Sequence, residues 1–269
     1  LVDGVGKFLP ESKRGVPTPF VATTKIFSLY KLFPKSKLFT KYYAQHLNEN
    51  ETGKVEILVG AFMIMKRELY LEVGGFDENC FMYSDDIDLS YMVIQKGKFN
   101  YYFHETSVIH YKGESTVKDK MYMKRFQEAM RFFYKKHYKA SFVFDIFMHI
   151  GVFFFTLFKK NRTIAILNKP EEYILLSNYE KLKKVLEDVL DDKVTLLLKT
   201  NLNSLTDRSV KKTEIVFDNN FLSFKSIIES MESCKNLEYT FKIIPKHSNF
   251  IIGSNNSNDR GQIIKIQKN

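Results

Sequence analysis

Cysteine is scarce in this 269-residue chain, which holds only Cys80 and Cys234. The two residues form no CxxC pair, so neither a disulfide framework nor a cysteine-based zinc site is indicated, and a reducing compartment fits best. The chain also begins without an initiator methionine and without the basic and apolar regions of a signal peptide. We therefore expect that further residues precede Leu1.

Three common binding motifs are missing as well. No GxGxxG loop accompanies the apolar runs near the C-terminus, which argues against a dinucleotide site. The DDIDL stretch lacks the central glycine and the twelfth-position glutamate of an EF-hand. No nucleic-acid-binding motif accompanies the net charge of +10, and the basic residues are interleaved with an apolar face, so we expect no nucleic-acid partner.

The positive charge is concentrated in the first part of the chain. Residues 1–162 carry 25 Lys and Arg against 17 Asp and Glu, whereas residues 163–269 carry 16 against 14. The first part should therefore bind an anionic partner, and a phosphorylated substrate and an acidic membrane surface both qualify. A hydrophobic content of 44% is sufficient for a folded core.

Up to about residue 116 the pattern indicates a mixture of helices and strands with irregular connections. FLPESKRGVPTPF, residues 8–20, is typical of a loop, and KVEILVGAFMIMK, residues 54–66, of a strand. RELYLEVGGF is a short helix ended by Gly74 and Gly75.

Two helices with broad apolar faces are expected next. Residues 119–139 have the pattern of a helix with Lys and Arg on one face. The other face carries, at helical spacing, Tyr122, Phe126, Met130, Phe133 and Tyr134. Residues 141–158 are the most hydrophobic stretch, but they barely reach membrane-spanning length, and Asp145 and His149 count against a span. A helix lying in the membrane interface is favoured over a span or a buried helix.

Residues 162–269 alternate apolar runs with helical patterns, which indicates a small, mainly parallel, half-Rossmann-like sheet. Strands are predicted at 163–169, 193–199, 213–219, 237–244 and 250–255, and helices at 178–190 and 223–233. NKPEEY, after the first predicted strand, stands where a phosphate-binding loop would be expected. The polar loop 251–261 is either solvated or a ligand site in which Arg260 meets a phosphate.

Three carboxylates, those of Asp85, Asp86 and Asp88, crowd into GGFDENCFMYSDDIDLSY among aromatic side chains. One interpretation is capping, because acidic residues suit the N-terminus of a helix that Gly97 ends. The alternative is catalysis, because a carboxylate beside aromatic rings needs a cation, a metal or a ligand to compensate for lost solvation.

The surrounding motifs resemble the C-terminal half of the catalytic domain of inverting glycosyltransferases of family 2, of the rhamnosyltransferase-like surface-polysaccharide type. The resemblance covers residues 1 to about 137, and its motifs follow in order: Gly60-Ala61, Gly74 through Glu78, Phe81 through Tyr83, Asp85 through Leu89, Gly97, and His110 through Ser115. It implies the C-terminal part of a GT-A nucleotide-sugar-binding fold.

The resemblance also implies residue roles. Asp86 matches the general base that deprotonates the acceptor hydroxyl, Asp85 replaces the usual glutamate, and Asp88 orients or caps. Substrate binding is implied for Gly60, Ala61, Tyr83 and Lys112, where Lys112 supplies a point charge to the diphosphate. His110 matches a residue that holds the metal or the diphosphate, although a packing or surface role is the alternative. An arginine common in the family is replaced by Met92.

The implied protein is an inverting transferase that moves a sugar from a nucleotide-sugar donor to a glycan or lipid-linked acceptor. A divalent metal, Mg or Mn, is expected through an Asp-x-Asp that should precede this chain. The expected domains are a partial GT-A domain at 1–118, membrane-associating helices at 119–161 and a Rossmann-like domain at 162–269. The helices are expected to hold the protein peripherally on the anionic cytoplasmic face of the membrane. The alternative is a non-catalytic membrane-associated scaffold or sensor.

Overall fold

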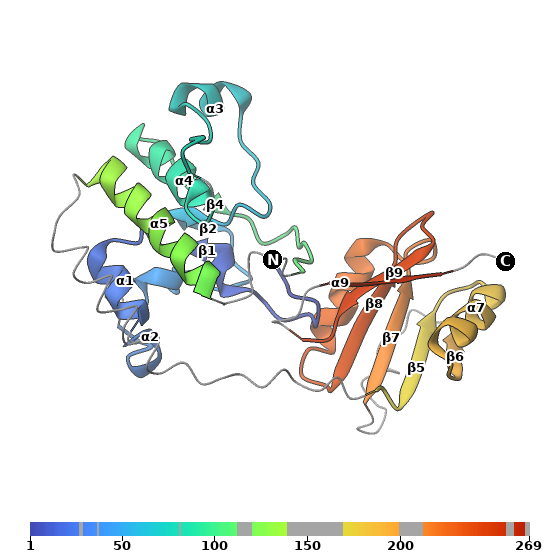
Figure 1. Ribbon diagram of the computed structural model, residues 1–269. Coiled ribbons are helices and arrows are strands. Elements are labelled where there is room, and N and C mark those ends of the chain that lie inside the picture. Colours follow the sequence, from blue (N-terminus) through green and yellow to red (C-terminus); the bar gives the residue numbers. More distant parts are fainter. Residues whose placement is uncertain are drawn as a thin grey trace. The chain divides into compact units, whose positions relative to one another are not determined.

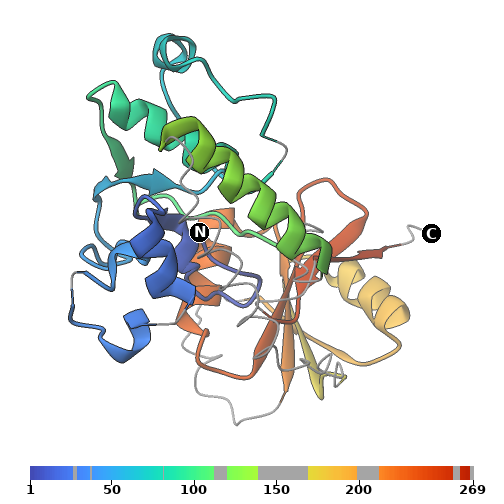
Figure 2. The same cartoon turned by 60° about the vertical axis from the view of Figure 1, so that its left-hand side comes forward.

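The chain is mixed α/β and divides into two compact units. The computed structural model describes residues 1–26, 29–36, 38–80, 82–111, 120–138, 169–198, 212–256 and 261–266. One unit, the helix unit, comprises Pro10–Thr106 and Lys118–Thr163, and the other, the sheet unit, comprises Leu1–Leu9, Ser107–Val117 and Ile164–Asn269. Figure 1 shows the elements of both units, and Figure 2 shows them from a second direction.

The helix unit holds two small antiparallel ribbons. Strand β1, Lys13–Arg14, pairs with β3, Ile57–Leu58, and β2, Gly53–Val55, pairs with β4, Asn100–Tyr102. The predicted strand 54–66 is thus confirmed only at its start, because the chain turns at Gly60. The predicted loop 8–20 contains β1. The remaining short elements before β2 are η1, Pro10–Ser12, α1, Pro19–Ile26, α2, Leu29–Leu32, and η2, Lys41–Tyr43.

Two predicted helices of this unit are confirmed. Helix α3, Arg67–Val73, ends at Gly74, which has a left-handed φ of 90°, and Gly75 follows with a φ of 69°. Glycine reaches these angles without the steric cost that a Cβ atom imposes. Helix α4, Asp85–Gln95, begins in the acidic motif.

Helix α5, Lys120–His137, confirms the helix predicted at 119–139. The apolar side chains of Met130, Phe133 and Tyr134 are buried in one cluster with Ile57 and Ile87. The hydroxyl of Tyr134 also donates a hydrogen bond to the carbonyl of Pro17. This part of the apolar face is therefore covered within the helix unit, and burial against the unit's own core accounts for it without a membrane.

The stretch predicted as a Phe-rich helix, residues 141–158, lies outside the described residues, as does the predicted strand at 163–169 except for Lys169. Within the part of the chain that the structure describes, no helix is both long enough and apolar enough to cross a membrane. The interfacial helix therefore stays a prediction.

A six-stranded sheet forms the centre of the sheet unit, with strand order β10-β9-β8-β7-β5-β6. Four neighbouring strands run parallel, and the last two strands of the chain pair antiparallel at one edge. The strands are β5, Glu172–Leu176, β6, Val194–Leu197, β7, Thr213–Asp218, β8, Tyr239–Ile244, β9, Phe250–Ser254, and β10, Gln262–Lys265. The predicted small, mainly parallel sheet is confirmed.

Both faces of this sheet are covered. Ile174 and Leu176 of β5 point into a cluster that includes Met231 of helix α9, Phe224–Ser233. Leu175, which alternates with them, packs in a second cluster that Leu186 of helix α7, Glu180–Leu190, helps to form. Burial on both faces explains why the strands read as continuous apolar runs.

Two strands were missing from the sequence prediction. β5 occupies part of the NKPEEY segment that was interpreted as the loop after the first strand, so that interpretation was wrong. The turn after β5 starts instead at Ser177 and contains no glycine before α7. This turn therefore also lacks the glycine-rich loop of a dinucleotide site. β10 was not anticipated.

The start of the chain is part of the sheet unit. Gly6 has a φ of 76°, and a Cβ atom there would lie 2.3 Å from the carbonyl oxygen of Met231. Val2 bridges Ile109, which packs on the sheet core. Residues 1–9 and 107–117 thus belong to the same unit as the C-terminal part of the chain. The domain boundaries expected from the sequence, at 118 and 161, followed changes in composition and did not predict this grouping.

Candidate functional site

The three carboxylates of the acidic motif occupy the first turn of α4. Successive residues of a helix point about 100° apart, so adjacent side chains enter different surroundings. Ser84, the residue before the helix, makes no capping hydrogen bond with its side chain. The carboxylates of Asp86 and Asp88 bind groups from other segments, so capping alone does not account for the motif.

Asp86 is held by an arginine and a main-chain amide. Its Oδ2 accepts hydrogen bonds from Nη2 of Arg14 at 2.5 Å and from the amide of Gly60 at 2.9 Å. Its other oxygen, Oδ1, is buried and has no hydrogen-bond partner among the described residues. The residue is only 8% exposed. One oxygen of Asp86 is thus fixed, and the other retains its capacity to accept a hydrogen bond.

Arg14 reaches Asp86 because of the β1–β3 pairing. The register places Arg14 opposite Ile57, and Nη2 also donates to the carbonyl of Leu58 at 3.3 Å. Burial is the largest influence and disfavours the charge of the guanidinium, but the interactions with Asp86 and Tyr42 together outweigh it, and the pKa of Arg14 is raised. Sequence analysis missed this residue. The one signal for it in the sequence was Met92, which stands where the resembled family often has an arginine. Without that arginine, the acidic motif has no cation nearby in the sequence.

Asp88 binds α5 instead. Its carboxylate, 1% exposed, lies 2.6 Å from Nε2 of His137 and 2.8 Å from Nζ of Lys136. Lys136 also binds Asp77 at 2.8 Å, and this hydrogen bond holds the pKa of Asp77 at about 2. The network joins α4 to α5, so Asp88 orients structural elements and does not share the surroundings of Asp86.

Asp85 is half-buried on another side of the helix. Burial, together with the adjacent charge of Asp86, raises the pKa of the Asp85 carboxyl. The motif therefore brings together carboxylates in three different surroundings. Paired acids whose surroundings favour different protonation states are typical of sites that transfer protons.

The neighbouring residues implied as substrate contacts are placed differently from one another. A Cβ atom at Gly60 would lie 3.1 Å from the Cβ of Asp86, so the small residue lets the turn approach the carboxylate closely. Ala61 is exposed on the same turn. Tyr83 is partly buried and has a left-handed φ of 72°, a rare angle for a non-glycine residue that is found more often at functional sites.

The two residues implied for the diphosphate and the metal are not among the described residues of the helix unit. His110 belongs to the sheet unit, where its amide donates to the carbonyl of Val2 at 2.8 Å. Lys112 lies outside the described residues. Across those described residues, no three His, Cys, Asp or Glu side chains gather in a way that would hold a metal ion.

Comparison with known proteins relates part of the chain to a sugar transferase. A stretch of 87 residues, 32% of this chain, is 33% identical to the N-acetylglucosaminyl-diphospho-decaprenol L-rhamnosyltransferase of two Mycobacterium tuberculosis strains. The matched stretch spans 28% of the length of that relative. No protein-family model matches the chain, and no solved structure matches it significantly. Over about a third of its length, the chain is similar to a glycosyltransferase.

Proposed function

We propose that this chain is the C-terminal part of an inverting glycosyltransferase of family 2 with a GT-A fold. The enzyme would move a sugar, such as rhamnose, from a nucleoside diphosphate to a glycan or lipid-linked acceptor in surface-polysaccharide synthesis. The proposal depends most on one observation: Asp86 is held through one carboxylate oxygen while the other, although buried, has no hydrogen-bond partner among the described residues. The partial similarity to a rhamnosyltransferase supports it.

In the proposed reaction, Oδ1 of Asp86 accepts the proton of the acceptor hydroxyl. The acceptor oxygen attacks the anomeric carbon as the bond from that carbon to the diphosphate oxygen breaks, and the nucleoside diphosphate leaves with the electron pair. The configuration inverts because attack and departure occur on opposite sides. Arg14 and the amide of Gly60 fix Oδ2, so the carboxylate is oriented before the acceptor arrives.

The other two aspartates have separate roles in this proposal. Asp85 directly precedes the base in the sequence, and its half-buried carboxyl group, whose pKa is raised, would contact the acceptor in this proposal. Asp88 keeps α4 fixed on α5 through Lys136 and His137, and so holds the base in position. Asp88 is thus a positioning residue.

The divalent metal and the membrane are proposals for the whole protein. The described residues supply no ligand set for a metal, so no step is derived through one, and Mg or Mn would bind mainly through an upstream Asp-x-Asp and His110. Peripheral attachment at the cytoplasmic face of the membrane depends on residues 141–158 and on exposed lysines such as Lys135.

A non-catalytic scaffold derived from such an enzyme is the second candidate. The Arg14–Asp86 ion pair favours it, because a buried carboxylate that is bound to an arginine can serve a purely structural role. The two candidates differ in one measurable property, which is the transfer of sugar.

Replacing the base tests the proposal in the full-length protein. Asp86→Asn removes the proton acceptor and should lower transfer from a nucleotide-sugar at least 1,000-fold, with donor binding retained. Asp77→Asn is the matched control, since it neutralises a carboxylate of the same unit that, among the described residues, binds Lys136 and its own loop. Circular dichroism checks that both variants fold. Transfer by Asp86→Asn within tenfold of the wild-type rate would exclude Asp86 as the base, and absence of transfer in the wild-type protein would favour the scaffold.

A further inference from the structure

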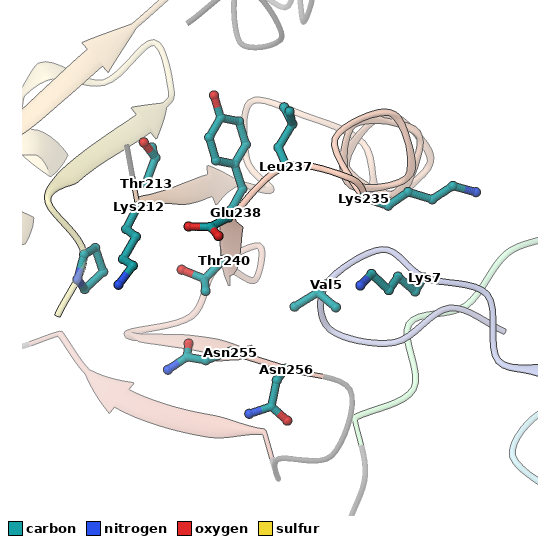
Figure 3. A pocket seen from close by; sticks show the side chains of 12 residues that line it. Val5, Lys7, Lys212, Thr213, Lys235, Leu237, Glu238, Thr240, Asn255 and Asn256 are labelled. Carbon is teal, nitrogen blue, oxygen red and sulfur yellow. The ribbon is translucent and has the colours of Figure 1, made fainter. Parts of the chain in front are cut away.

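A hollow of about 380 Å³ lies in the sheet unit, far in sequence from the acidic motif. It forms where β7 and β8 begin and where the antiparallel β9 ends, because these three strands are neighbours in the sheet. The loop around Val5 closes one side of it (Figure 3). Ligands of parallel α/β sheets usually bind at the carboxyl ends of the strands. This hollow lies instead at the amino ends of the parallel strands β7 and β8.

A buried ion pair fixes one polar group of the hollow. Lys242 is 2% exposed, and its Nζ lies 3.7 Å from the carboxylate of Glu214, which is 5% exposed. The same Nζ donates to Oδ1 of Asn255 at 2.8 Å. Since an ammonium group has no acceptor, it must face the amide oxygen. The NH₂ group of Asn255 is therefore the part of the amide that can donate to a ligand.

The same ion pair fixes a hydroxyl. Oγ1 of Thr240 donates to the carboxylate of Glu214 at 3.2 Å, and its only proton is used in that bond. Toward a ligand, Thr240 can act only as an acceptor. Glu238, whose exposed carboxylate also lines the hollow, is a second acceptor. The hollow thus offers acceptors that suit hydroxyl groups as well as an oriented amide donor.

Positive charge flanks these groups. Figure 3 shows Lys212 and Lys7 on opposite sides of the hollow, whereas the ammonium group of Lys235 is directed away from it. Two lysines against the single carboxylate of Glu238 favour a ligand with a negative charge. A volume of about 380 Å³ is within the range of small-molecule sites.

We propose that this hollow binds an anionic saccharide, that is, a sugar carrying a phosphate or a carboxylate group. The lysines would pair with the anionic group, and Asn255, Thr240 and Glu238 would bind the sugar hydroxyls. A simple inorganic anion would leave the acceptors without a donor, and a neutral sugar would leave the lysines without a counter-charge. The site does not depend on transferase chemistry, and it is tested by binding alone.

Titration of the whole 269-residue chain distinguishes these ligands. The probes are glucose 1-phosphate and glucuronate, each compared with glucose and with inorganic phosphate by calorimetry. We expect at least one anionic sugar to bind ten or more times more tightly than glucose and phosphate. Equal binding of phosphate would reduce the site to an anion site and overturn the proposal, as would a failure of both anionic sugars to bind.

Two variants locate the binding. Asn255→Asp keeps an oxygen against Lys242 but replaces the amide donor with a negative charge, so the fold is kept and affinity should fall at least tenfold. Lys212→Met should reduce affinity to a similar extent. Lys246→Met is the matched control, because this exposed lysine follows the carboxyl end of β8, whereas the hollow lies at the amino end of that strand. Unchanged affinity in Asn255→Asp, or an equal loss in Lys246→Met, would overturn the site.

Discussion

Arg14 and Asp86 lie 72 residues apart in the sequence and form a buried ion pair in which Nη2 and Oδ2 are 2.5 Å apart. The arginine comes from a strand of two residues, and the aspartate from the first turn of a helix. Each partner still has one buried polar atom without a hydrogen-bond partner in the described residues, Nε of Arg14 and Oδ1 of Asp86.

Arg14→Met should destabilise the protein by about 3–5 kcal/mol, because it leaves the carboxylate of Asp86 buried without its cation. The double variant Arg14→Met/Asp86→Leu removes both charges and should recover most of that loss. Urea denaturation of the two variants measures the difference. Equal stability of the single and double variants would show that the charge of Arg14 does not offset the cost of burying the carboxylate of Asp86.

Arg14→Lys addresses positioning in the full-length enzyme. The lysine keeps the charge but cannot place a planar guanidinium at this site, where a single nitrogen, Nη2, donates to both Asp86 and the carbonyl of Leu58. We expect kcat to fall about 100-fold, because misplacing a reacting group by about 1 Å has that effect, while KM for the donor is unchanged. A proportional rise in KM with kcat unchanged would instead place Arg14 in donor binding.

Asp88→Ala should cost about 1.5–3 kcal/mol of stability, because it removes the buried carboxylate that accepts a hydrogen bond from Lys136 and lies against His137. Asp77→Ala breaks a more exposed contact of the same lysine and should cost less than about 1 kcal/mol. Thermal and urea unfolding of both variants provide the measurement. If the two substitutions cost the same, the α4–α5 contact does not depend on the burial of Asp88.

Asp85→Asn should stabilise the protein at pH 7. Burial and the charge of Asp86 raise the pKa of Asp85 above its ordinary value of 3.8, so the ionised carboxylate is less favourable in the folded chain than in the unfolded chain. That cost is present above the folded pKa and disappears as pH falls below 3.8. The melting temperature of the variant should therefore exceed that of the wild type at pH 7 and match it near pH 3. A difference in melting temperature that stays constant from pH 7 to pH 3 would contradict the raised pKa of Asp85.

Lys242→Met should destabilise the sheet unit by about 3–5 kcal/mol at pH 7, since it leaves the buried carboxylate of Glu214 without a cation. Burial raises the pKa of Glu214, so the carboxyl group is neutral at lower pH and needs no partner there. The loss should accordingly shrink as pH falls. Adding Glu214→Met should restore stability at pH 7, and a further loss would show that packing, and not charge, governs the site.

Local signals sufficed to predict several elements. Gly74 and Gly75 ended α3 as expected, and the helical spacing through Met130 and Phe133 located α5, because caps and periodicity act over a few residues. The apolar runs that became β7 and β8 were identified for the same reason.

Partners that meet through tertiary pairing were not predictable. Arg14 was part of a segment interpreted as loop, and nothing near it indicates that a two-residue pairing with β3 carries its side chain to Asp86. Likewise, Asp88 and His137 are 49 residues apart, and nothing near either residue in the sequence indicates that they meet. β5 was missed because its five residues follow Pro170 and carry no alternating polar pattern, as expected for a strand buried on both faces.

The grouping of residues 1–9 and 107–117 with 164–269 has a consequence for synthesis on the ribosome. The polypeptide passes from one unit to the other four times, so the first nine residues emerge long before the strands with which they are grouped. Gly6 can reach its place beside Met231 only after the intervening residues, including the whole of the helix unit, have been translated. Residues 1–9 therefore stay unassembled while the whole of Pro10–Thr106 is synthesised, and the two units cannot be completed one after the other along the chain.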